Sequence, residues 1–183
     1  TALVESELTY RRAFEGSNDA MVLFESGKFL DCNEAALRIF GYSTRDEFLG
    51  TNVGAISPPL QADGRESRSA IDEHTVAAFR DGRDFFEWLQ QRPDGTVFPA
   101  DVLLTPLDYH GQKVLQATVR DITPRKTAEA EIAQLSRKNQ LILDAAGEGI
   151  IGLDSTGRCS FINPAAVQML GYDLSEMVGQ RLH

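Results

Sequence analysis

The side chains that most often carry catalysis or hold metal ions are few in this chain and lie far apart. The histidines are His74, His110 and His183, and the cysteines are Cys32 and Cys159. None of these residues stands at the spacing of a zinc site, and neither a phosphate-binding glycine loop nor a serine, histidine and acid combination occurs. We therefore expect that this segment is not an enzyme and holds no metal.

Aromatic side chains offer a binding surface instead. Phe86 and Trp88 stand two residues apart in a predicted strand, and period-two alternation places both rings on one face. His74 lies on a predicted helix, three residues after Ile71 and on its apolar side. We expect both rings to point toward an inner cavity, with His74 near its helical wall. The alternative is that both rings pack against the N-terminal helix on the opposite face.

Turn and capping residues define the elements that must position these side chains. Gly27 supplies the positive φ of a tight turn, and Asn33 can cap a helix by accepting a hydrogen bond from an orphan backbone N–H. Ser57-Pro58-Pro59 marks a loop over 52–64. The expected elements are, in chain order, a helix over 3–15, strands over 20–24 and 28–32, helices over 33–40, 43–49 and 69–81, and strands over 84–92, 96–107 and 112–121. This order predicts an α+β fold, a five-stranded antiparallel sheet with helices on one face.

A sequence motif of the first half is repeated near the end of the chain. Asn33-Glu34-Ala35-Ala36 with Gly41-Tyr42 corresponds to Asn163-Pro164-Ala165-Ala166 with Gly171-Tyr172, at a distance of 163 − 33 = 130 residues. A repeat of this length has the size of a domain, so we interpret it as a duplicated module. We expect the second copy to be incomplete, with only its first strands and helices in this chain.

A long helix is predicted between the two copies. Thr123 can cap it, Pro124 fits its first position, and it extends to about Ala146. Its apolar stripe follows the 4-3-4-3-4 spacing of a two-stranded coiled coil and consists of Ala128, Ile132, Leu135, Asn139, Ile142 and Ala146. Asn139 at an a position fixes register and favours dimers. We expect a homodimer through this linker helix; the alternative is an amphipathic helix packed on its own sheet.

The charge of the chain disfavours some classes of partner. With a net charge of −9 and a pI near 4.8, the chain repels nucleic acid and anionic membranes. No apolar run approaches the roughly 20 residues of a membrane-spanning helix. We expect no nucleic-acid partner, no membrane contact by this segment, and a cytoplasmic location in which both cysteines are reduced.

The order and spacing of these motifs resemble those of PAS domains that end in a PAC motif. The matching pieces are Asn33 with Gly41-Tyr42, Phe86-Glu87-Trp88, Arg92-Pro93-Asp94-Gly95-Thr96, Phe98-Pro99 and the closing Arg120-Asp121-Ile122-Thr123-Pro124-Arg125-Lys126. Residues 9–123 resemble one whole module, and residues 139–183 resemble the first part of a second. The resemblance implies a PAS-like sheet, a linker helix and an incomplete second PAS copy.

The resemblance also implies a division of the chain and a function. The implied parts are a flanking helix over 1–18, a PAS domain with its PAC motif over 19–123, a signalling helix over 124–146 and a truncated PAS domain over 147–183. Such modules sense a small ligand or cofactor state and transmit it through a dimeric helix to an output domain outside this segment, a histidine kinase or diguanylate cyclase. The alternative is a dimerisation scaffold without a ligand.

No particular cofactor is indicated by the resemblance. The stretch over 50–56 lacks the cysteine of thiol-adduct flavin sensors. Haem-binding relatives place a histidine ligand on the long helix, where His74 lies, and flavin-binding relatives use an aromatic and polar pocket. The candidate cofactor-binding residues are Trp88, Phe86, Gln90, Asn33 and His74. An empty module is our first expectation, and haem, non-covalent flavin, a small metabolite and a fatty acid remain open as ligands.

Overall fold

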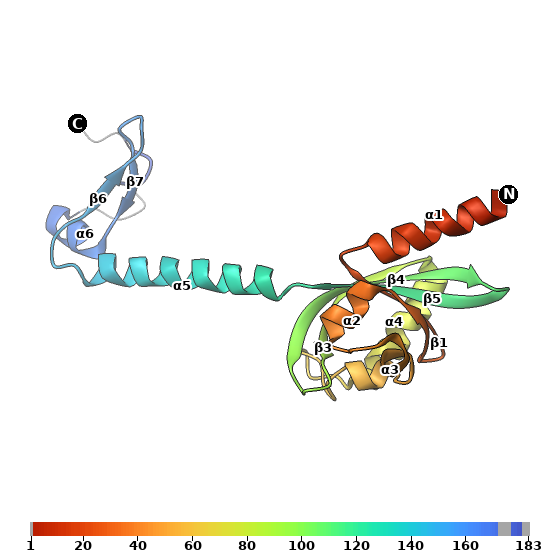
Figure 1. Ribbon diagram of the computed structural model, residues 1–183. Coiled ribbons are helices and arrows are strands. Elements are labelled where there is room, and N and C mark those ends of the chain that lie inside the picture. Colours follow the sequence, from red (N-terminus) through yellow and green to blue (C-terminus); the bar gives the residue numbers. More distant parts are fainter. Residues whose placement is uncertain (1, 172–176, 181–183) are drawn as a thin grey trace. The chain divides into compact units, whose positions relative to one another are not determined.

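The computed structural model describes residues 2–171 and 177–180, and the side chains of residues 8–171 and 177–180 (Figure 1). The chain divides into two compact units, Thr1–Arg125 and Lys126–His183. Tyr172, the last residue of the repeated motif, and His183 lie outside the described residues. Over the described part of the chain, no helix is both long enough and apolar enough to cross a bilayer.

The first unit is built on a five-stranded sheet, as the sequence predicts. Its strands are β1 (Ala20–Glu25), β2 (Lys28–Cys32), β3 (Asp84–Gln91), β4 (Val97–Tyr109) and β5 (Gln112–Asp121). The order across the sheet is β2-β1-β5-β4-β3, and all neighbouring pairs are antiparallel. The pairing of β1 with β5 joins the two ends of the unit, and β3 is an edge strand.

Helices lie on both faces of this sheet. They are α1 (Ala2–Gly16), α2 (Glu34–Phe40), α3 (Arg45–Leu49), the short 3-10 helix η1 (Val53–Ile56) and α4 (Ser67–Asp81). Figure 1 shows α2, α3 and α4 on one side of the sheet and α1 on the other. The main core lies between the sheet and α2 to α4, where Phe48 stacks on Phe29 with ring centroids 4.7 Å apart. The expected helical layer on one face is confirmed.

Two local predictions in this unit were wrong. The helix α4 begins at Ser67 rather than Ser69, because the Ser67 hydroxyl donates to the carbonyl of Pro58 and anchors the helix start in the preceding loop. The segment 52–64, predicted as a loop, contains η1, whose first turn is capped by the Asn52 side chain accepting from Ala55 N at 3.2 Å. Both starts depend on a side chain that bonds to backbone, and a propensity pattern does not reveal such a bond.

The second unit contains most of the linker helix and the start of the repeated module. Its elements are α5 (Thr123–Ala145, which begins in the first unit), β6 (Ile151–Leu153), β7 (Cys159–Ile162) and α6 (Pro164–Leu170). The two strands pair antiparallel. A small buried cluster packs beneath them and comprises Cys159, Ile162, Ala166 and Met177.

Candidate functional site

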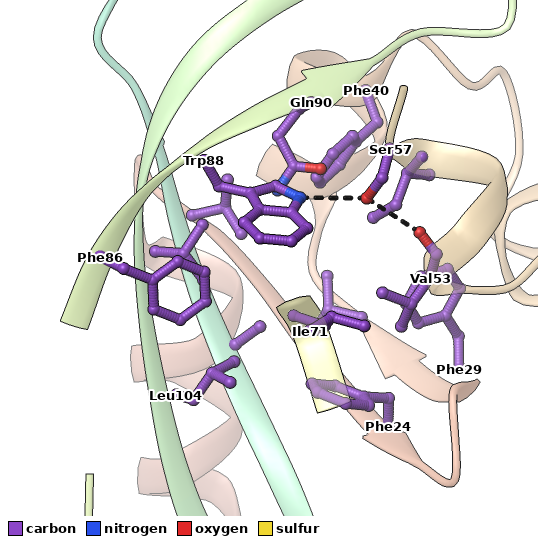
Figure 2. A pocket seen from close by; sticks show the side chains of 15 residues that line it. Phe24, Phe29, Phe40, Val53, Ser57, Ile71, Phe86, Trp88, Gln90 and Leu104 are labelled. Carbon is purple, nitrogen blue, oxygen red and sulfur yellow. Dashed lines mark hydrogen bonds between the residues drawn. The ribbon is translucent and has the colours of Figure 1, made fainter. Parts of the chain in front are cut away.

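An apolar cavity lies inside the first unit, between the sheet and the helical layer (Figure 2). Its volume is about 30 Å³. Side chains from all five strands, α2, η1 and α4 line it, and most are aliphatic or phenyl groups such as Phe24, Val53, Ile71 and Leu104. Three polar groups reach into this lining, from Ser57, Trp88 and Gln90.

The first two polar groups satisfy one another. The indole N–H of Trp88 donates to Ser57 Oγ at 3.1 Å, and this hydroxyl donates to the carbonyl of Val53 at 3.1 Å. Figure 2 shows this chain of hydrogen bonds crossing from β3 to η1. Because the indole is only 4% exposed, the bond satisfies a donor that would otherwise be buried without a partner.

Gln90 is different, because its side-chain oxygen has no partner. Gln90 is 4% exposed, and Oε1 accepts no hydrogen bond from any described residue. A buried acceptor without a donor costs about 1–3 kcal/mol. The cavity therefore has an apolar wall and one oxygen that lacks a donor, and a water molecule or a ligand N–H or O–H group would meet that need.

The size of the cavity limits what it can hold. A water molecule needs at least about 10–15 Å³ of such space, so about 30 Å³ admits one or two waters. Sites for larger small molecules have volumes of roughly 300–1,000 Å³. With its side chains in these positions, the cavity does not fit a flavin ring or a haem.

The structure brings three of the sequence-predicted site residues together. Phe86, Trp88 and Gln90 alternate along β3, and all three line the cavity. The two rings thus face the inner cavity, as the alternation predicts, rather than α1. His74 stacks on Phe86 with ring centroids 3.6 Å apart, and its Nδ1 lies 2.6 Å from Asp84 Oδ2. It stands near the helical wall but does not line the cavity.

Asn33 does not belong to the cavity, in contrast to its place in the predicted pocket. Its side chain is fully buried and bonded entirely to backbone: Nδ2 donates to the carbonyls of Phe14 and Asp19, and Oδ1 accepts from the amides of Met21 and Ala36. The capping prediction is confirmed, because the bond from Ala36 is the helix cap. The other three bonds tie the end of α1 to β1, so Asn33 has no free atom for a ligand.

The repeated Asn163 makes the same set of bonds. Its Nδ2 donates to the carbonyls of Leu143 and Glu148, both at 2.9 Å, and its Oδ1 accepts from the amides of Ile150 and Ala166. In each unit, one asparagine therefore fastens the end of the preceding helix to the first strand and the next helix. The repeat in the sequence thus corresponds to a repeated joint in the structure.

Two residues that matter here carried no usable signal in the sequence. Ser57, which holds the Trp88 indole, stands 31 positions away from it in a segment predicted as loop. Gln61 caps the free edge of β3, where Nε2 donates to the carbonyl of Leu89 at 3.3 Å and Oε1 accepts from its amide at 2.7 Å. Both contacts connect segments far apart in the chain, and only the tertiary fold reveals them.

Comparison with known proteins decides the family. The profile of the family described as "PAS domain" matches residues 18–124, and the profile described as "PAS fold" matches residues 137–183. The first match alone covers more than half of the 183 residues. The chain belongs to the PAS domain family. The resemblance stated from the sequence is thereby confirmed, and so is the α+β PAS fold.

Sensor proteins are among the relatives of this PAS domain. The methyl sulfide methyltransferase-associated sensor of Methanosarcina acetivorans is 29% identical over 181 residues, which cover 94% of this chain and 17% of that protein. The oxygen sensor protein DosP of Escherichia coli is 27% identical over 169 residues, which cover 88% and 20%. A solved domain of a sensory box sensor histidine kinase/response regulator from Geobacter sulfurreducens is 26% identical with a TM-score of 0.51, over 65% of this chain and 96% of that one. The chain spans about a fifth of the length of the curated relatives it matches.

Two arginines connect the PAS domain to the start of the linker helix, Arg92 from within the domain and Arg125 from α5. Arg92 donates to the carbonyl of Ile39 at 2.9 Å and to Asp121 Oδ2 at 3.1 Å, and Asp121 Oδ1 accepts from the amide of Thr123 at 2.8 Å. Arg125, near the start of α5, donates to Glu87 on β3 at 3.1 Å. The same Arg125 donates to Asp101 on β4 at 3.2 Å.

Cys32 is a structural residue of the PAS domain. Its side chain is buried, and burial raises the pKa of the thiol to about 11. Because the thiolate is the reactive form, a thiol with this pKa is a poor nucleophile near neutral pH.

Proposed function

We propose that residues 19–123 sense a small ligand at the inner cavity and that α5, paired with α5 of a second copy, transmits the response to an output domain outside this segment. A histidine kinase or a diguanylate cyclase is the class of output we propose. The relatives include an oxygen sensor and a domain of a sensor histidine kinase/response regulator, which supports this direction.

The unpaired oxygen of Gln90 is the observation that carries the ligand part of this proposal. It lies in an apolar cavity on an edge strand, where a donor from a ligand would relieve a buried polar group. The same strand reaches the linker helix, because Glu87 on the opposite face of β3 binds Arg125. A ligand that shifts Trp88 or Gln90 would therefore move an ion pair at the start of α5.

The exposed stripe of α5 supports the dimer. Within the described part of the chain, no side chain of this helix is buried, and Ile132 and Leu135 are 69% and 60% exposed. The 4-3-4-3-4 spacing and the central Asn139 fit a second copy of the same helix in parallel. With 23 residues at about 1.5 Å each, the helix spans about 34 Å and carries the stripe from Ala128 to Ile142, while Ala146 follows the end of the helix.

The hydrogen bonds of Asn163 fix the C-terminal end of α5 within the second unit. Since Asn163 binds the carbonyl of Leu143, a rotation or shift of the helix is passed to β6 and α6 through this side chain. We propose that the second PAS segment receives the signal at this joint.

A scaffold that dimerises without a ligand is the second candidate, and the small volume of the cavity favours it. Native mass spectrometry of the purified chain distinguishes the two. Sensing predicts an added mass that is lost on denaturation and absent from the Gln90→Leu variant. A spectrum of bare protein, unchanged after incubation with cell extract, would support the scaffold and contradict the sensing proposal.

A further inference from the structure

An open groove lies beside the cavity of the first unit. It has a volume of about 650 Å³ and lies between the β1–β2 turn, η1, α4 and the start of β5. Four residues line both the groove and the cavity: Phe24, Val53, Ser57 and Ile71. Figure 2 shows these four side chains among those that line the cavity. The groove therefore has the volume of a small-molecule site and shares part of its wall with the cavity.

The rim of the groove carries three cations from three different elements. They are Lys28 on β2, Arg68 on α4 and Lys113 on β5. None of these side chains has an ion pair or a hydrogen bond to any residue that the structure describes, whereas Arg45 binds both Glu15 and Asp31. Glu25 and Asp72 also line the groove, so its formal charge is 3 − 2 = +1 on a chain of −9. Such a local reversal of sign attracts an anion.

The inner wall of the groove is apolar. Phe24, Val53, Ile71 and Leu115 contribute to it, and the Phe79 ring beside them is 45% exposed. A cationic rim beside an apolar wall fits a molecule that is charged at one end and apolar along its length.

We propose that this groove binds a single-chain amphiphile with an anionic oxygen head group. The head lies against Lys28, Arg68 and Lys113, and the chain lies over Phe24, Val53 and Ile71. A carboxylate and a phosphate monoester share this chemistry. This inference rests on the proposed sensing function, because the amphiphile is the class of ligand that the module would sense.

Occupancy of the groove has a direct reporter. Ser57 and Val53 both line the groove. The Ser57 hydroxyl accepts from the Trp88 indole N–H and donates to the carbonyl of Val53. Trp88 is the only tryptophan of the chain. A chain lying on Val53 and Ser57 changes the environment of this indole, so tryptophan emission reads out binding without a label.

The test is a titration of the full chain, followed by tryptophan emission and by calorimetry, with four probes below their micelle concentrations. Decanoate and decyl phosphate carry the proposed head groups, and decanol and decylamine are the neutral and cationic controls. We expect one or both anions to bind and shift the emission, and decylamine to leave it unchanged. Binding of one anion alone identifies the head group as carboxylate or phosphate.

Matched charge variants decide whether the rim is responsible. Arg68→Gln with Lys113→Gln should weaken anion binding by about tenfold or more, the loss expected for charge-assisted contacts. Arg38→Gln with Arg83→Gln removes the same charge from two exposed residues of the same unit that do not line the groove, and it should change anion binding less than about twofold.

Three results would overturn the inference: no binding of either anion up to about 1 mM, equal binding of decylamine, or equal weakening in both double variants. A cavity ligand without an anionic group, found by native mass spectrometry, would refute this inference while leaving the sensing proposal standing.

Discussion

Because the side-chain oxygen of Gln90 is unpaired, we predict that replacing this buried residue stabilises the protein. Replacing Gln90 with Leu puts an apolar side chain of similar length on the inner face of β3 and removes a buried acceptor that lacks a donor. An unsatisfied buried group costs about 1–3 kcal/mol, so we expect the free energy of unfolding of ligand-free protein to rise by about 1–2 kcal/mol. Most substitutions of buried residues lower it.

Gln61 provides the matched control, since it is also a buried glutamine beside β3. Its amide donates to Ser67 Oγ at 2.7 Å and to the carbonyl of Leu89, and its oxygen accepts from the amide of Leu89. Gln61→Leu removes all three bonds, so we expect the free energy of unfolding to fall by about 2–4 kcal/mol.

The assay is urea unfolding of protein that has been denatured, dialysed to remove any ligand, and refolded. A shift of the midpoint at constant m-value measures the change in stability. If Gln90→Leu and Gln61→Leu destabilise the protein equally, the Gln90 oxygen has a partner in solution, and the argument from an unsatisfied group is wrong.

Three further predictions test other parts of the structure. Trp88→Ala should lower the free energy of unfolding by about 3–5 kcal/mol, whereas Phe85→Ala, on the exposed face of the same strand, should cost less than about 1 kcal/mol; equal losses in urea unfolding would place the two rings in equivalent environments. Asn163→Ala should speed hydrogen exchange at the amides of Ile150 and Ala166 by at least about tenfold, because both lose their acceptor; unchanged exchange would mean that the joint is dispensable. The pKa of Cys32 is raised to about 11 in the folded protein, so its contribution to stability is complete below the ordinary thiol pKa and is lost as the pH rises through the folded value. Between about pH 9 and pH 11 the wild type should lose about 2 kcal/mol more than Cys32→Ala. Parallel pH curves would contradict burial of the thiol.

Local sequence patterns predict much of the fold and part of the candidate site. Alternation along β3 put Phe86 and Trp88 on the inner face, because the period of two holds wherever a strand is regular. The same rule extends to Gln90. The role of these residues in binding a ligand remains a prediction.

What the sequence did not reveal depends on contacts between distant segments. The sequence predicts that Asn33 caps a helix, but its Nδ2 bonds to Phe14 and Asp19 depend on where α1 ends, and they leave no atom for a ligand. Ser57 lies in a segment predicted as a loop, and nothing in the sequence indicates that its hydroxyl accepts from the Trp88 indole N–H. The groove joins side chains from β2, α4 and β5, and its cationic rim exists only after the chain has folded.

We propose that the PAS domain signals through a dimer of its linker helix, and sedimentation equilibrium tests this dimer most directly. Ile132→Glu with Leu135→Glu places charges in the stripe, while Leu141→Glu places one at a residue that is 61% exposed but off the stripe. At tens of micromolar, we predict a dimer for the wild type and for Leu141→Glu, and a monomer for the double variant. A monomeric wild type, or a dimer that survives the double substitution, would contradict the account.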